Sequence, residues 1–300
     1  MSAQLIPLRS DDAVGDVKSP EARPTGPRMS TRNRLLFFLT AWLIVLMPFL
    51  FWWNTWFGRP LSDKQVGEYL CDNNHPRHIQ HAIVQLGQRI SQHDPIAAHW
   101  YPDLLRLASH PREEVRSTDA WVMGQDPTGP GFHDALSKML GDPSLIVRGN
   151  AALSLVSFGD NSGREQVVSL LEPISVISPS GGRITDSAKV GTPVHQGGLV
   201  ATLIDGQQVH ELRSPISGRV RTLEVTTGSN AGPGTPIATI DPEEQQVWEA
   251  LRALYLIGRV EDLPAIRPYQ RELPEISDRV RKQALETERE IEERANKRAD

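Results

Sequence analysis

The longest uninterrupted apolar stretch of the chain lies near its N-terminus, from Leu35 to Trp53. It runs for nineteen residues without an ionisable side chain, and twelve of these residues are Leu, Ile, Val or Phe. At 1.5 Å of rise per residue, a helix of this length matches a hydrocarbon core about 30 Å thick. The pattern therefore predicts a single transmembrane helix over residues 32–57.

The residues that flank this stretch predict an orientation. Arg32 and Arg34 precede it, as do Lys18, Arg23 and Arg28, whereas few cations follow it closely. By the positive-inside rule, the N-terminus is then cytoplasmic and the large C-terminal part is periplasmic. Residues 1–31 are polar and lack apolar periodicity, so we expect a disordered cytoplasmic tail.

Tryptophans gather where the apolar stretch ends, at Trp52, Trp53 and Trp56. Indole rings are enriched at membrane interfaces, so these residues fit an aromatic belt. A cleaved signal peptide fits less well, because its apolar region is about 7–15 residues long and ends in small residues. We therefore predict a single-pass protein of a bacterial inner membrane, with the lipid bilayer as one partner.

Helical periodicity and a repeated motif occupy residues 63–172. Two blocks, Ser109–Val122 and Gly141–Ser154, align at a spacing of 32 residues. Proline, valine, arginine and alanine recur in the same places, and the two arginines are Arg116 and Arg148. Asp142 stands where a helix N-cap is expected. We expect Trp100, Tyr101 and Trp121 in the helical core, or as interface anchors if they are exposed.

The second block resembles a HEAT repeat in its short bacterial form. The matching residues are Asp142, Pro143, Val147, Arg148, Ala151, Ala152, Leu155, Gly159 and Asp160. The resemblance implies an α-solenoid of stacked helix pairs, whose exposed faces bind other proteins. The alternative interpretation is an ordinary α-helical domain in which the two blocks are similar by chance.

Short β-rich runs, broken by glycine-containing turns, occupy residues 173–241. A second repeat, with a spacing of 37 residues, relates Gly191 and Gly197 to Gly228 and Gly234. Such runs are typical of small antiparallel strands. The duplication predicts two interlocked halves related by a pseudo-twofold axis.

This β-rich segment resembles the biotinyl/lipoyl domain, a flattened β-sandwich or barrel. The resembling residues are Arg213 to Val220, Val225, Gly228, Gly234 and Ile237 to Asp241. In carrier members of that family, a lysine at the tip of the central hairpin accepts biotin or lipoate. Here that position falls on Gln207, and no lysine lies between Val190 and Lys282. An amide nitrogen is not a nucleophile, so we expect no attached cofactor.

The cofactor-free form of this domain is similar to the one in membrane-fusion proteins, the periplasmic adaptors of bacterial export systems. Such adaptors insert a long coiled-coil hairpin between the two halves of the domain. In this sequence the halves join through a tight turn at Asp205 and Gly206, which leaves no room for a hairpin. The resemblance therefore covers the domain and the membrane topology only.

Helical periodicity returns over residues 242–300, where Val247, Leu251 and Leu254 share one helix face. The last stretch loses its apolar face and ends as a charged helix with i,i+4 pairs such as Glu290 and Arg294. The predicted fold class is α+β multidomain. It comprises a single transmembrane helix, a HEAT-like α-solenoid, and a lipoyl-type antiparallel β-domain inserted between helical repeats.

One cluster carries metal-ligand residue types, namely Cys71, His75, His78 and His81. On a helix His78 and His81 would share a face, and zinc or haem could be held there. No CxxC or CxxCH motif is present, however, and a proline interrupts the entry to the helix. We therefore expect these residues to be polar groups on the solenoid surface, with no metal bound.

Charge and motif content limit the functions that fit. The net charge is −5 and no dense basic stripe occurs, so nucleic acid is not expected as a partner. No Walker, G-x-S-x-G or other nucleophile–base spacing is present, so we expect no enzyme.

These features together predict a membrane-anchored, non-enzymatic scaffold or adaptor, an accessory subunit of a bacterial membrane protein complex. Its partners would be other membrane or periplasmic subunits, which bind the solenoid and the lipoyl-like domain. Two alternatives stay open. One is a periplasmic adaptor of an export system, and the other is a cofactor-carrying or metal-binding subunit of an enzyme complex.

Overall fold

A computed structural model describes residues 30–56 and 60–299. The chain divides into two compact units, Met1–Arg59 and Pro60–Asp300. All but the last two residues of the predicted tail, 1–31, lie outside the described residues.

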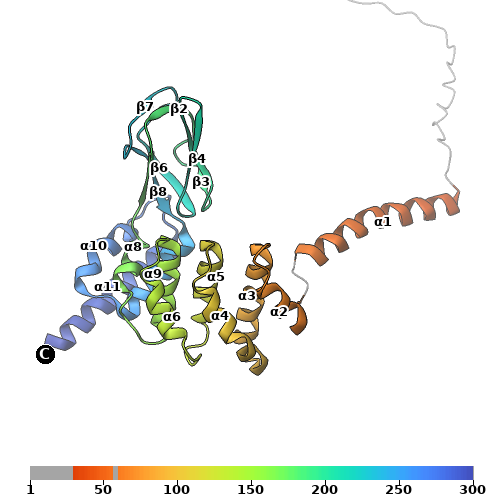
Figure 1. Cartoon of the computed structure of the whole chain (residues 1–300), viewed down its shortest axis with the longest axis horizontal. Coiled ribbons are helices and arrows are strands. Elements are labelled where there is room, and N and C mark those ends of the chain that lie inside the picture. The colour runs from red at the N-terminus through yellow and green to blue at the C-terminus, as the bar shows by residue number, and fades with distance from the viewer. Residues whose placement is uncertain (1–29, 57–59, 300) are drawn as a thin grey trace, which may run out of the picture. The chain divides into compact units, whose positions relative to one another are not determined.

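Helix α1, Thr31–Trp56, is the described part of the first unit (Figure 1). Large apolar side chains on it are exposed, among them Leu35, Phe38 and Trp42. It also contains Arg32 and the residues of the predicted interface, although the side chains of Arg34, Trp52, Trp53 and Trp56 lie outside the description.

The prediction of a membrane span does not hold for this helix. In the described part of the chain, no helix is both long enough and apolar enough to cross a bilayer, which requires about 20 predominantly apolar residues. On this finding the predicted transmembrane helix over residues 32–57 is wrong. The predicted inner-membrane location and topology, which rested on that span, are wrong with it.

Helices α2 to α11 of the second unit form what we call the helical array (Figure 1). Their bounds are α2 Asp63–Leu70, α3 Pro76–Ser91, α4 Tyr101–Leu107, α5 Glu113–Met123, α6 Phe132–Met139, α7 Leu145–Ser157, α8 Arg164–Ser169, α9 Glu244–Ile257, α10 Leu263–Ile266 and α11 Asp278–Ala299. Short 3-10 helices lie at Pro95–Trp100, Val260–Asp262 and Arg267–Gln270.

The odd-numbered helices α3, α5, α7, α9 and α11 pack against one another in that order. Helices α5 and α7 begin 32 residues apart, which is the spacing of the sequence repeat. Helix α9 begins 99 residues after α7, and the strand-rich segment Ile174–Pro242 accounts for 69 of those residues. Ala152 of α7 and Val247 of α9 share one buried core, so the helices before and after that segment belong to one array.

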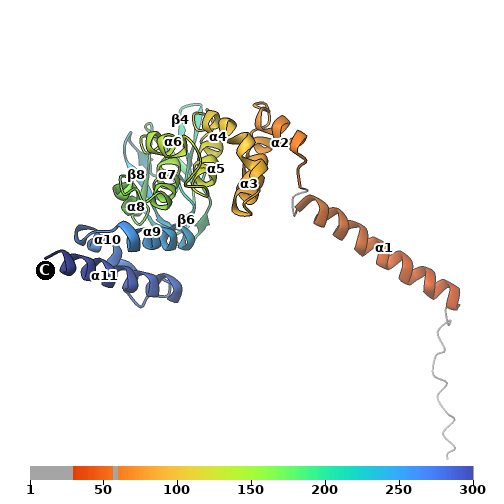
Figure 2. The same cartoon turned by 90° about the horizontal axis from the view of Figure 1, so that it is seen from below.

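The strand-rich segment Ile174–Pro242, which we call the β unit, contains two four-stranded antiparallel sheets (Figures 1 and 2). The strands are β1 Ile174–Ile177, β2 Gly182–Ser187, β3 Pro193–Val194, β4 Leu199–Asp205, β5 Gln208–Arg213, β6 Gly218–Leu223, β7 Asn230–Ala231 and β8 Pro236–Pro242. Their order is β1-β8-β6-β3 in one sheet and β5-β4-β2-β7 in the other. Each sheet therefore takes strands from both halves of the sequence duplication.

Matched hydrogen bonds join the two halves of the β unit. The N–H of Gly197 donates to the carbonyl of Ser214 at 2.8 Å. The corresponding N–H of Gly234 donates to the carbonyl of Ser178, also at 2.8 Å. Both glycines have positive φ, 73° and 75°, and both serines are buried. The repeated glycines thus hold equivalent turns, each of which is bonded to the other half.

We expect Gly197→Ala and Gly234→Ala to lower the free energy of unfolding by similar amounts, about 1–2 kcal/mol each. A side chain in the left-handed backbone region costs this much, and no described atom lies within 4 Å of an added Cβ at either position. Urea unfolding of the full chain measures the change. Gly181→Ala is the matched control, because Gly181 lacks a positive φ and its nearest atoms would lie 3.9 Å from the new Cβ. Clearly unequal losses at the two turns would contradict their structural equivalence.

The β unit contacts the array at the N-terminal ends of α5 and α7. The side chain of Gln196 donates to a carboxylate oxygen of Glu113 at 3.1 Å. Leu145 and Ile146, at the start of α7, pack against the core of the β unit. The β unit is therefore in contact with the array away from its covalent connections.

Candidate functional site

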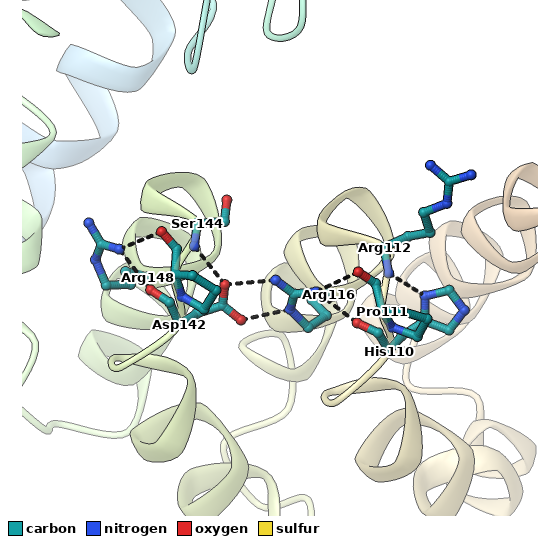
Figure 3. Close-up of polar contacts among 8 residues, drawn as sticks. His110, Pro111, Arg112, Arg116, Asp142, Ser144 and Arg148 are labelled. Atoms are coloured by element: carbon teal, nitrogen blue, oxygen red, sulfur yellow. Dashed lines mark hydrogen bonds and ion pairs between the residues drawn. The ribbon is translucent and has the colours of Figure 1, made fainter. Parts of the chain in front are cut away.

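The arginines of the sequence repeat make the same contacts with the chain just before their own helices (Figure 3). Nη1 of Arg116 donates to the carbonyls of His110 and Pro111, at 2.7 and 3.2 Å. Nη1 of Arg148 donates to the carbonyls of Asp142 and Pro143, at 2.7 and 3.0 Å. Each arginine therefore fixes the loop that leads into its helix.

Arg116 also pairs with the next repeat. Its Nε and Nη2 donate to the two carboxylate oxygens of Asp142, at 2.6 and 2.8 Å (Figure 3). The two side chains are only 12% and 8% exposed. The N–H of Ser144 donates to the same carboxylate at 2.8 Å. This buried pair joins α5 to the start of α7, and its role is structural.

Asp142 is not the N-cap that the sequence predicted. Ser144 occupies the N-cap position of α7, and the carboxylate of Asp142 instead accepts hydrogen bonds from Arg116 and from the N–H of Ser144. Arg148 differs from Arg116 in having no acidic partner among the described residues. The partner of Arg148 would stand 32 residues after Asp142. That position is Ile174, the first residue of strand β1, so no aspartate is there to pair with Arg148.

An open hollow of about 350 Å³ lies on the surface of α5, α7 and α9. Its lining includes the small residues Gly124, Ser154 and Ala253. Helices α5 and α7 approach closely there, since a Cβ on Gly124 would lie 2.3 Å from the hydroxyl of Ser154. Two of the large apolar side chains that line it are exposed, Trp121 at 50% and Leu256 at 60%.

The prediction of core positions for the aromatic residues is correct for Trp100 and wrong for Trp121. Trp100 is 5% exposed, and Tyr101 is half-buried with its hydroxyl donating to Asp126 at 2.6 Å. Trp121 instead occupies the outer side of α5, where an interface anchor is expected.

The hollow carries a cation at its edge. The guanidinium of Arg252 lies 4.7 Å from the ring centre of Trp248, and that of Arg279 lies 3.7 Å from the same ring. Arg252 is exposed and forms no ion pair within the described part of the chain. Glu249, which also lines the hollow, accepts a hydrogen bond from Gln245 at 2.6 Å. Arg252 therefore presents a positive charge to whatever occupies the hollow.

A separate cluster of ionisable side chains lies between α2 and the start of α3. Nδ1 of His75 lies 2.9 Å from a carboxylate oxygen of Asp72, and Nδ1 of His78 lies 2.8 Å from the same oxygen. The potential ligand atoms of these three residues all lie within 4.8 Å of one another. We call this group the Asp72 cluster.

The sequence predicted only part of this cluster. His75 and His78 are in it, whereas His81 instead interacts with Gln85 at 3.1 Å and Cys71 is an exposed free thiol. Asp72 was not predicted as a ligand. The hydrogen bond from His78 makes the largest contribution to the lowered pKa of Asp72. Burial acts in the opposite direction, and His75 lowers the pKa further.

Gln207 is exposed at the tip of the hairpin between β4 and β5. Asp205 of β4 pairs with Gln208 of β5, so the hairpin closes through a two-residue turn of Gly206 and Gln207. Gly206 has φ 58°, as such a turn requires. The position at which the resemblance would place an attachment lysine is therefore accessible and carries an amide.

Comparisons with known proteins do not identify the chain. No family model matches it, and no curated protein matches it. A solved structure of a single-chain, multi-domain long-chain acyl-CoA carboxylase matches at 18% identity with a TM-score of 0.23. The match covers 43% of this chain and 14% of the carboxylase chain, and a likeness this weak carries no argument. The resemblances to HEAT repeats and to the biotinyl/lipoyl domain therefore stay predictions.

Proposed function

We propose that this protein is a non-enzymatic binding scaffold, an accessory subunit that holds a segment of a partner protein on its helical array. The observation that carries the proposal is the hollow on α5, α7 and α9, where Trp121 and Leu256 are exposed and small residues are also part of the lining. Exposed aromatic side chains at a depression are the usual anchors of protein interfaces. The predicted HEAT-like character of the array supports the same function.

The chemistry of the hollow favours one kind of occupant. The exposed side chains of Trp121 and Leu256 suit an apolar side chain. Arg252 suits a carboxylate, because it forms no ion pair with an acidic residue of the described chain, including Glu249 of the same hollow. Stacking on Trp248 holds the guanidinium in place and leaves its polar edge for hydrogen bonds. We therefore propose that the partner segment carries an apolar anchor residue and a nearby aspartate or glutamate.

Selection of a displayed random peptide library on the full chain tests this proposal. We expect the selected peptides to share an apolar residue next to an acidic one. Trp121→Ala should weaken their binding by about tenfold or more, as loss of an interface anchor does. Fluorescence anisotropy of a labelled selected peptide measures the affinity.

Two matched variants control this experiment. Val190→Ala removes an exposed apolar side chain in the β unit and should leave the affinity unchanged. Arg252→Glu should replace acidic by basic residues in the selected peptides, whereas Arg271→Glu, an equally exposed charge reversal outside the hollow, should not. Peptides that bind Trp121→Ala as well as the unchanged chain, or a selection that yields no shared pattern, would contradict the proposal.

A further inference from the structure

The Asp72 cluster brings three metal-ligand groups together within a short segment. Asp72 follows α2, His75 occupies the N-cap position of α3, and His78 lies in the first turn of α3. The N–H of His75 donates to the carbonyl of Asp72 at 3.1 Å, and that of His78 donates to the carbonyl of His75 at 2.8 Å. These two turns place the three side chains on one side of the backbone. We propose that Asp72, His75 and His78 bind a divalent late-transition-metal ion, with Zn²⁺ as the type.

The distances within the cluster are close to those that a metal requires. Zinc lies about 2.0–2.1 Å from histidine nitrogen and about 2.0–2.2 Å from carboxylate oxygen, so tetrahedral ligand atoms are roughly 3.4 Å apart. In the structure, Nδ1 of His75 and Nδ1 of His78 lie 2.9 and 2.8 Å from the same oxygen of Asp72. An opening of about half an ångström, within reach of small side-chain rotations, would admit the ion.

The donor set indicates the class of metal. Two imidazole nitrogens and one carboxylate oxygen suit Zn²⁺, Ni²⁺ or Cu²⁺, whereas Mg²⁺ and Ca²⁺ prefer oxygen ligands alone. Three protein ligands leave a position for water or another ligand, and the side chains of His75 and His78 are 65% and 43% exposed. The site would therefore be open to solvent and independent of the hollow on α5, α7 and α9.

A neighbouring ring fixes one of the ligands. Tyr69, in α2, stacks on the imidazole of His78 with 4.4 Å between ring centres and 11° between planes. This contact restricts rotation of His78 and keeps its Nδ1 directed toward Asp72.

Isothermal titration of the full chain with Zn²⁺ alone, and the visible absorption of added Co²⁺, test the assignment. We expect one ion per chain, with binding weakened by about tenfold or more in His75→Ala, His78→Ala and Asp72→Asn. His99→Ala removes an exposed histidine outside the cluster and should leave binding unchanged. Circular dichroism at the same protein concentration checks that each variant keeps its helices.

Two further measurements distinguish this site from a thiolate site at Cys71 and from a site that binds Mg²⁺. Cys71→Ser should bind Zn²⁺ with the affinity of the unchanged chain, because the exposed thiol lies outside the cluster. Mg²⁺ at millimolar concentration should not compete. The assignment is overturned if Zn²⁺ binding survives in both histidine variants, if it depends on Cys71, or if the folded chain takes up no ion.

Discussion

Arg116→Met is expected to lower the free energy of unfolding by about 3–5 kcal/mol, the usual loss when one partner of a buried ion pair is removed. The reason lies with the partner left behind. Asp142 is 8% exposed and would keep only the N–H of Ser144 as a donor. A buried carboxylate without its counter-charge is costly, because little water reaches it. Urea unfolding of the full chain measures the loss.

The chain supplies its own control for this prediction. Arg148 occupies the matching place one repeat later and makes the same two contacts with backbone carbonyls. It has no acidic partner in the described ranges, so Arg148→Met should cost only about 1–3 kcal/mol for the lost hydrogen bonds. The double variant Arg116→Met with Asp142→Leu should recover part of the loss, since it removes the stranded charge. Equal losses in Arg116→Met and Arg148→Met would contradict the assigned role of the ion pair.

The same pair predicts a pH dependence. Burial raises the pKa of Asp142, but the hydrogen bonds from Arg116 and Ser144 outweigh it, and the pKa is lowered overall. A carboxyl group with a lowered pKa in the folded state stabilises the fold at pH values above its pKa in the unfolded chain, which is about 3.9. This stability is lost as the pH falls through the pKa of the folded state. Stability of the unchanged chain should therefore decline in acid below about pH 4, and Arg116→Met should show a smaller decline there.

Repeats in the sequence predicted the parts of the fold that depend on local geometry. Gly197 and Gly234 recur because each turn needs a positive φ, and this requirement is visible at single positions. Arg116 and Arg148 recur because each fixes the loop before its helix, although only Arg116 has an acidic partner among the described residues. That difference arises because the β unit begins at Ile174, the position one repeat after Asp142.

The residues that sequence reasoning missed depend on how the chain turns or packs. Asp72 reaches His75 and His78 only because the loop after α2 folds back on itself, although the D-x2-H-x2-H spacing was available as a signal. Trp121 was predicted in the core, or as an interface anchor if exposed, and the packing of α5 against α7 leaves it exposed. The membrane span was inferred from the length and apolar content of one stretch and from the residues that flank it, and the described helices do not include a span.

Asp119→Ala is expected to raise the free energy of unfolding at pH 7 by about 1–3 kcal/mol, the cost of an unsatisfied buried polar group. Asp119 lies in α5 and is fully buried, and neither of its carboxylate oxygens has a hydrogen-bond partner within the described structure. At the matching position one repeat later the chain carries Ala151, which is also fully buried. The array therefore already accommodates alanine at this place, and the substitution removes the polar group with little loss of packing.

The gain should depend on pH in a defined direction. Burial raises the pKa of Asp119 well above its usual value, and the positive charge of Arg106 opposes this only in part. A carboxyl group with a raised folded pKa contributes most stability below the unfolded pKa of about 3.9 and loses it as pH rises through the folded pKa. The advantage of Asp119→Ala over the unchanged chain should therefore increase from pH 5 to neutral pH and above.

Urea unfolding of the full chain at several pH values measures both effects. Asp119→Asn is the matched variant, because it keeps the shape and removes the ionisation. It should abolish the pH dependence assigned to this group but recover less stability than alanine, since an unsatisfied amide stays buried. A chain destabilised by Asp119→Ala at every pH would show that the carboxyl group has a partner in solution, and a gain independent of pH would show that its ionisation does not matter.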